Sequence, residues 1–156
     1  ERTRFDVLLP AQSTALPARE AVESALPPPG NGELIPVVDD EESIRRVLAN
    51  ALGRHNYRVR MAADGAEAAA VFAQHATEVK LVIADIDMPY LDGITLTKVL
   101  RNMYPEIKVL LSSGLTSPQP ESRNAELAAL NVGAVLAKPY TVASVLATVH
   151  RVLASP

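Results

Sequence analysis

Acidic residues stand directly after two short apolar runs of the chain, where they could do chemistry. Asp39 and Asp40 follow one such run, and Asp85 and Asp87 follow the run 81–84. Carboxylates that lie close together repel one another, so they need a cation or shifted pKa values. A cluster of oxygen ligands without His or Cys suits a hard divalent ion, Mg²⁺ before Zn²⁺. These acids are therefore candidate metal ligands.

Two further polar groups end other apolar runs. Ser113 follows one of them and precedes Gly114, and Lys138 ends another and precedes Pro139. A carboxylate beside Mg²⁺, an ammonium and a hydroxyl is equipped for phosphoryl transfer, because each partner neutralises or hydrogen-bonds a phosphoryl oxygen. The acceptor would be Asp85, which would then carry an acyl phosphate.

The apolar patterning predicts the elements that bring these residues together. Short apolar runs predict strands over 34–38, 57–61, 81–84, 108–112 and 134–137. Each is followed by residues at helical spacing or by a capping residue, which gives five βα units with short connections. Such units form a parallel sheet with helices on both faces. The second strand alternates like a sheet edge and the third is continuously apolar, so we expect the order 2-1-3-4-5 of a flavodoxin-like (βα)5 three-layer sandwich, an α/β fold.

Apolar periodicity also predicts which side of each helix faces the core. The inward residues are expected to be Leu96, Val99, Leu100 and Met103 in one helix, and Val142, Val145, Leu146, Val149 and Val152 in the last. Thr141 is expected to cap the last helix, and Asn56 to supply a left-handed helix end. Pro36 is awkward within a strand, since it removes a ladder donor.

Composition narrows the class of protein. The chain has 156 residues, 48% of them hydrophobic and 21% charged, with a net charge of -3. It is not basic enough for general nucleic-acid binding. The lack of cysteine excludes disulfides and thiolate metal sites and fits a reducing compartment. No apolar run approaches the roughly 18 residues of a membrane span, and no signal peptide opens the chain. We therefore expect a cytoplasmic globular protein without membrane contact.

The composition also divides the chain. Predicted strands and helices alternate over residues 34–156, which form one domain. Residues 11–33 are rich in Pro and Gly, which predicts an unpacked linker. Residues 1–10 contain one short strand pattern, interpreted as the remnant of a preceding domain. The chain opens on Glu1 rather than Met, which favours a piece of a longer protein.

The combined motifs resemble the receiver domain of two-component response regulators over about residues 34–154. The acidic pair Asp39-Asp40, the stretch Asp85-x-x-Met-Pro-x-x-Asp-Gly93, the Ser113 hydroxyl and Lys138-Pro139 follow that family's order and spacing. Each motif alone is weak, but the set is specific. A helix N-terminus rich in acids, a surface lysine or a hydroxyl at a strand end would be ordinary if it stood alone.

The resemblance implies a role for each residue. Asp85 is expected to be the phosphoacceptor, with Asp40 and Asp85 as direct Mg²⁺ ligands. Asp39 would act partly through water, and the backbone carbonyl of Asp87 would complete the protein ligands. Ser113 and Lys138 would bind the phosphoryl group. A cis Lys138–Pro139 peptide is also expected.

The resemblance implies partners as well. A receiver takes its phosphoryl group from a phosphohistidine in a histidine kinase domain and passes the signal on, in some systems to a downstream phosphotransfer protein. The stretch 4–10 resembles the last strand of a histidine-kinase ATP-binding domain. The parent is therefore predicted to be a hybrid histidine kinase, with a free-standing regulator as the other possibility. The three histidines of this chain are on different predicted helices and are not expected to be phosphodonors.

Three features depart from the family pattern. Val135 stands where many receivers have an aromatic residue that swings inward on activation. Asp87 is a carboxylate where well-known members have Asn, and its extra charge is expected to sharpen the dependence on Mg²⁺. The stretch 114–132 is longer than usual.

Two alternatives compete with the receiver reading. A haloacid-dehalogenase-like phosphatase would use Asp85 as nucleophile and Asp87 as general acid. Its acidic motifs come in the reverse order, however, and this chain is too short to include a cap domain. A pseudo-receiver that binds a partner without phosphorylation would not need the complete site.

Overall fold

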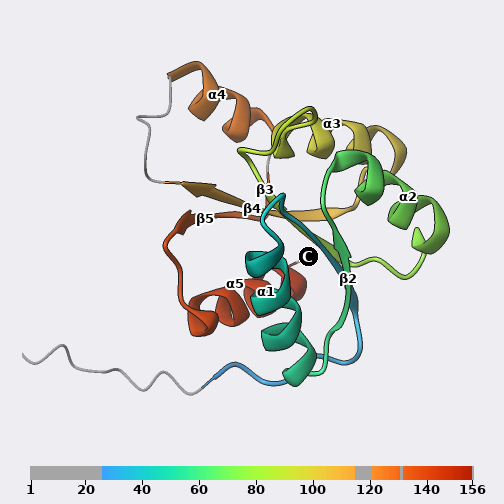
Figure 1. Cartoon of the computed structure of the whole chain (residues 1–156), viewed down its shortest axis with the longest axis vertical. Helices are drawn as coiled ribbons and strands as arrows, with labels where there is room; N and C mark the ends of the chain where they lie inside the picture. Colours follow the sequence, from blue (N-terminus) through green and yellow to red (C-terminus); the bar gives the residue numbers. More distant parts are fainter. Residues whose placement is uncertain (1–25, 115–120, 131, 156) are drawn as a thin grey trace, which may run out of the picture.

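The computed structural model describes residues 26–114, 121–130 and 132–155, without the side chains of residues 121–124. Strands and helices alternate along the chain (Figure 1). The strands are β1 (Leu34–Val38), β2 (Arg58–Ala62), β3 (Leu81–Asp85), β4 (Lys108–Gly114) and β5 (Ala134–Lys138). The helices are α1 (Glu42–Arg54), α2 (Gly65–His75), α3 (Gly93–Met103), α4 (Glu121–Ala129) and α5 (Val142–Ala154). None of the helices in these described ranges is long and apolar enough to cross a membrane.

The strands form one parallel sheet in the order β2-β1-β3-β4-β5, as predicted. Figure 1 shows the sheet between two helical layers, with α1 and α5 on one side and α2, α3 and α4 on the other. β3 lies in the middle of the sheet and is buried along its whole length, which explains why its residues 81–84 are all apolar. Short βα connections keep every strand parallel, so all the carboxyl ends meet at one edge of the sheet.

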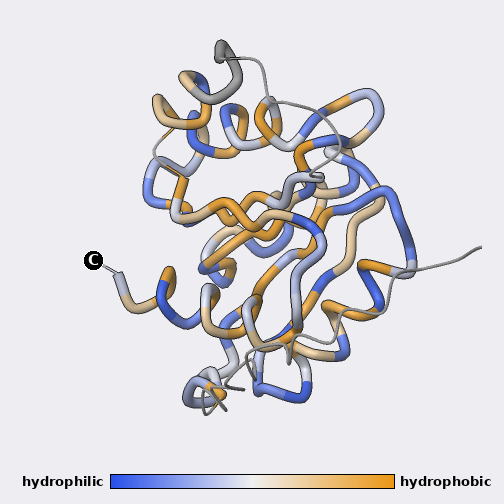
Figure 2. The backbone as a smooth tube through the Cα atoms, turned by 90° about the vertical axis from the view of Figure 1, so that its left-hand side faces the viewer, coloured by the Kyte–Doolittle hydropathy of each residue, from blue (hydrophilic) through white to orange (hydrophobic). Residues whose placement is uncertain are grey.

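Alternation along the strands divides the core into two clusters. Ile35, Ile83 and Leu110 pack against α1 and α5, whereas their neighbours Val82 and Leu111 pack against α2 and α3. Successive side chains of a strand point to opposite faces, so both faces of the sheet are apolar and covered. Figure 2 shows the hydrophobic segments gathered in the middle of the molecule and the hydrophilic ones toward its outside.

Three apolar residues that were expected inside the core are partly exposed. Val99 and Met103 of α3 are 39% and 59% exposed. In their place α3 buries Thr97, whose hydroxyl donates to the Gly93 carbonyl at 2.6 Å. That bond satisfies a polar group and lets the helix turn its Thr97 side inward. Val142, 43% exposed, lies one turn before the buried stripe of α5.

Helix ends follow the predicted capping residues. The Thr141 hydroxyl accepts from the Ser144 amide at 3.1 Å, and the Ser144 side chain completes a capping box at the start of α5. Asn56 has φ 65°, the left-handed conformation expected after a helix.

Pro36 is accommodated by an irregular ladder. β1 pairs with β2 along its whole length, but its pairing with β3 is broken. Leu34 pairs with Val79 while Val37 pairs with Ile83, so the register differs by one residue between these two bridges. The break spans Pro36, which has no amide to donate.

The predicted linker is packed over residues 27–33, which corrects the expectation that it is unpacked up to residue 33. The Gly30 amide donates to the His55 carbonyl at 2.9 Å, and the Asn56 side chain donates back to the Gly30 carbonyl at 2.6 Å. Gly30 lies so close to the Tyr57 ring that a Cβ would come within 2.3 Å of it. We call residues 27–33 the strap. The remaining predictions for residues 1–25 lie outside the described residues.

Candidate functional site

Three carboxylates meet at the carboxyl edge of the sheet. Asp85 ends β3 and Asp39 directly follows β1, and the alternation of each strand turns both toward the α1 and α5 side. Both are nearly buried, with exposures of 6% and 2%. Asp40, the next residue, is exposed, and one oxygen from each of the three carboxylates lies within 4.8 Å of the others.

Lys138 joins two of these carboxylates. It ends β5, and its Nζ lies 2.9 Å from Oδ1 of Asp85 and 3.0 Å from Oδ2 of Asp39. Burial would lower the pKa of Lys138, but its bonds to Asp85 and Asp39 prevail and raise it. The ammonium therefore stays charged, and the following peptide bond to Pro139 is cis as predicted.

Asp39 is held from two sides. Its Oδ1 accepts from the Glu41 amide at 2.9 Å, while Oδ2 accepts from Lys138. Burial raises the pKa of Asp39 despite these bonds, and the neighbouring Asp85 adds to the rise. One ammonium thus faces three acids, which leaves an excess of negative charge in the site.

The three-carboxylate group fits a hard cation. Oxygen ligands of Mg²⁺ lie about 2.1 Å from the ion, so two opposite ligands are about 4.2 Å apart. Adjacent ligands are about 3 Å apart, so three oxygens that lie within 4.8 Å of one another are close enough to approach one ion together. The exposed Asp40 opens the group to solvent, through which an ion can enter.

The turn after β3 brings a helix against Asp85. The Gly93 amide donates to the Ile86 carbonyl at 3.2 Å, and the Asp92 side chain caps α3 by accepting from the Thr95 amide at 2.6 Å. A Cβ on Gly93 would come within 2.3 Å of the Asp85 carbonyl oxygen. The close approach of α3 thus requires glycine at this position.

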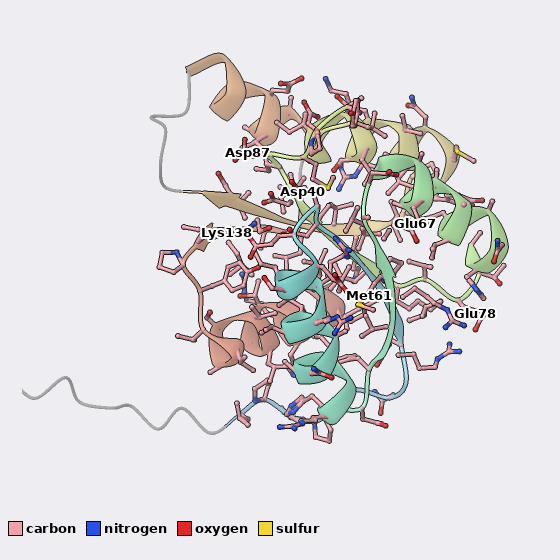
Figure 3. All side chains as sticks on the ribbon, viewed as in Figure 1. Asp40, Met61, Glu67, Glu78, Asp87 and Lys138 are labelled. Atoms are coloured by element: carbon pink, nitrogen blue, oxygen red, sulfur yellow. The ribbon has the colours of Figure 1, made fainter. Side chains whose placement is uncertain are left out.

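Asp87 and Ser113 are two further predicted site residues, one just after β3 and the other near the end of β4. The Asp87 side chain is exposed and does not belong to that group, although Figure 3 shows Asp87 at the same end of the sheet as Asp40 and Lys138. Ser113 is half-buried on β4. The roles of the Asp87 carbonyl and the Ser113 hydroxyl remain predictions.

Ser112 is a site residue that was not predicted from the sequence. This residue pairs in register with Asp85, and its hydroxyl donates to Oδ1 of Asp85 at 3.1 Å. Its side chain is almost fully buried. Register pairing puts two side chains on the same face of a sheet, so once the strand order is known, Ser112 rather than Ser113 is the expected neighbour of Asp85 on this face.

Comparison with known proteins identifies the class that this fold and site define. Residues 35–150 match the response regulator receiver domain family. The chain is 32% identical over 159 aligned residues to the sensor kinase CckA of Brucella abortus, covering 97% of this chain and 16% of that protein. The chain belongs to the response regulator receiver domain family, a module of two-component systems.

Other relatives differ in architecture. The response regulator MprA of a Mycobacterium species is 32% identical over 119 residues, which cover 75% of this chain and 49% of MprA. The chain thus spans half or less of these curated relatives. The structure of chemotaxis protein CheY4 of Vibrio cholerae aligns with a TM-score of 0.69 and 30% identity, covering 78% of this chain and 98% of that one. This family membership does not favour the phosphatase alternative.

Proposed function

We propose that Asp85 accepts a phosphoryl group from a phosphohistidine in a Mg²⁺-dependent reaction. The observation that carries the proposal is the Asp85 carboxylate, bound by Lys138 at 2.9 Å and grouped with Asp39 and Asp40 at the end of the central strand. Mg²⁺ would be held by the carboxylates of Asp39, Asp40 and Asp85 and by the Asp87 carbonyl, and it would offset the negative charge of the incoming phosphoryl oxygens.

The protein groups have separable tasks in this step. An oxygen of Asp85 forms a bond to phosphorus while the bond from phosphorus to the donor imidazole breaks and its electron pair returns to nitrogen. Lys138 stays charged and can bind a phosphoryl oxygen while it remains near Asp85. Ser113, near the end of β4, would donate a second hydrogen bond to the phosphoryl group.

We further propose that the chain is the C-terminal receiver of a hybrid histidine kinase. The alignment with CckA covers 97% of the chain, whereas that with MprA covers 75%. The likeness to a sensor kinase therefore extends beyond the receiver into residues that precede β1. On this proposal the donor is a histidine kinase domain of the same parent, and a downstream phosphotransfer protein can receive the group.

Labelling with a small-molecule phosphodonor tests the phosphoacceptor. Wild type with acetyl phosphate and Mg²⁺ should acquire one phosphoryl group, and Asp85→Asn should acquire none. Asp64→Asn is the matched control, because Asp64 caps α2 through the Glu67 amide and Asn keeps that cap. Persistent stoichiometric labelling of Asp85→Asn would overturn the assignment. Continuous release of phosphate from aryl phosphates would instead support a phosphatase.

The parentage is tested on the longer gene product. A histidine phosphoacceptor helix followed by an ATP-binding domain upstream of residue 1 would support a hybrid kinase. Transfer from its phosphohistidine to Asp85, measured with labelled ATP, would establish the donor. A coding sequence that starts within this chain would contradict the proposal.

A further inference from the structure

A second donor shares the Asp85 oxygen that Lys138 binds. Both the Lys138 ammonium and the Ser112 hydroxyl contact Oδ1, at 2.9 Å and 3.1 Å. Ser112 is only 2% exposed, so solvent does not compete for its hydroxyl. The two donors therefore bias the carboxylate toward using its other oxygen, Oδ2, as the nucleophile.

Tyr140 provides a buried hydroxyl close to this bond. It follows the cis Lys138–Pro139 peptide, and its ring packs on the α1 and α5 core cluster. Its hydroxyl is buried and has no hydrogen-bond partner among the described residues. Burial raises the pKa of Tyr140, and the neighbouring Ser112 side chain acts in the opposite direction, although the two hydroxyls do not complete a hydrogen bond. A buried hydroxyl without a partner is unfavourable, so a small movement that closes this bond is favoured.

We propose that Tyr140 and Ser112 form a hydroxyl relay to Asp85 that shortens the lifetime of its acyl phosphate. Tyr140 donates to the Ser112 oxygen, and Ser112 donates to Oδ1 of Asp85. Both are positioning residues, since neither touches the phosphoryl group. This inference rests on the proposed function of Asp85.

The direction of the effect follows from the charge on Asp85. During hydrolysis, a water oxygen bonds to phosphorus while the bond from phosphorus to the Asp85 oxygen breaks. The electron pair of that bond returns to the carboxylate, and the proton of the water goes to solvent. Oδ1 is a neutral carbonyl oxygen in the acyl phosphate and becomes charged as the phosphoryl group leaves. A hydrogen bond to a charged acceptor is stronger than one to a neutral acceptor, so the relay stabilises the transition state more than the acyl phosphate.

Four variants test the relay through the decay of the labelled protein after the phosphodonor is removed. Ser112→Ala should slow the first-order decay about fivefold and Tyr140→Phe about twofold. The double variant should decay like Ser112→Ala alone, because Tyr140 acts through Ser112. Ser112→Thr keeps the hydroxyl and should restore a decay within about twofold of wild type. Tyr57→Phe, which alters a buried tyrosine at the opposite end of the sheet, is the control and should leave the decay unchanged.

The outcomes separate the relay from the proposed function. Wild type that takes no label contradicts the phosphoacceptor assignment itself. Wild type that is labelled, with a decay unaffected or accelerated in Ser112→Ala, overturns the relay alone. Effects of Ser112→Ala and Tyr140→Phe that multiply in the double variant would show that Tyr140 acts independently, and would also overturn it. Tyr140→Phe removes a single oxygen, so its result stands even if Ser112→Ala folds poorly.

Discussion

The two ends of the sheet are built on opposite principles. At the carboxyl end, Asp39, Asp40 and Asp85 crowd together with one ammonium among them. At the amino end, donors and acceptors are matched along the strap: the Gly32 amide donates to the Asn56 carbonyl at 3.0 Å, and the Arg58 side chain donates to the Gly32 carbonyl at 2.9 Å. The amino end is complete as it stands, whereas the carboxyl end carries a repulsion that a bound cation would relieve. The amino end therefore adds to stability, whereas the carboxyl end keeps an excess of negative charge.

The largest loss of stability should come from a side chain that obstructs the close contact between α3 and Asp85. In Gly93→Ala the new Cβ would meet the Asp85 carbonyl oxygen, a backbone atom that cannot move without the strand. We expect a loss of about 3 kcal/mol in the free energy of unfolding, measured by urea denaturation, together with weaker labelling. Gly53→Ala is the control: its Cβ meets no atom within 4 Å, and it lies in α1, so it should stabilise by about 0.5 kcal/mol. Equal effects of the two would mean that the close approach carries no constraint.

Removing the strap tests whether the amino end is truly part of the domain. A chain that begins at Leu34 should be about 2 kcal/mol less stable than one that begins at Leu26, because the Tyr57 ring and the Asn56 amide lose their cover. Gly30→Ala should reproduce about half of this loss in the longer chain, since its Cβ displaces the strap from Tyr57. Melting temperatures and urea midpoints measure both. Identical midpoints for the two chain lengths would show that residues 27–33 do not stabilise the domain and act only as a linker.

Mg²⁺ should stabilise the whole domain by binding at its carboxyl end. At ten times its dissociation constant the ion should add about 1.4 kcal/mol, a few degrees in melting temperature. Asp40→Asn should melt higher than wild type without Mg²⁺ and gain less when it is added, because one repelling charge is gone. Asp87→Asn should give a curve parallel to wild type, because its exposed carboxylate lies outside the three-carboxylate group. This differs from the expectation drawn from charge alone, and curves that converge at high Mg²⁺ would restore it.

The smallest effect is expected at Val135, which is 45% exposed on the edge strand β5. Val135→Ala should change the free energy of unfolding by less than about 0.5 kcal/mol. Phosphorylation-induced NMR shifts in β4 and α4 should persist in this variant, because a small exposed side chain does not report the state of the site by swinging inward. Loss of those shifts with labelling intact would make position 135 part of the switch.

Patterning and turn chemistry predicted the strand order and the convergence of Asp39, Asp85 and Lys138, because strand ends are set by local sequence and parallel strands share an edge. The contact of Ser112 with Asp85 could not be predicted, because the two adjacent serines differ only in the face of β4 on which they lie. The register between β4 and β3 determines which of them faces Asp85. The packing of the strap could not be predicted, because Pro and Gly indicate irregular backbone but do not indicate whether that backbone packs against the domain. Its contacts depend on Asn56 and Tyr57, more than twenty residues further along.

The strap also changes the geometry of delivery. If a phosphodonor is attached through the preceding chain, its tether ends at Leu26 and not at Glu33. The tether is therefore shorter by residues 27–33, which would span roughly 25 Å if extended. The strap leads into the amino end of β1, while Asp85 lies at the other end of the sheet, about 16 Å along a five-residue strand. The effective concentration of such a donor at Asp85 falls to near zero if the remaining tether cannot span the domain. If the parent is a hybrid kinase, anchoring the strap would therefore affect how often a donor in the same chain meets Asp85, relative to a donor in a second chain.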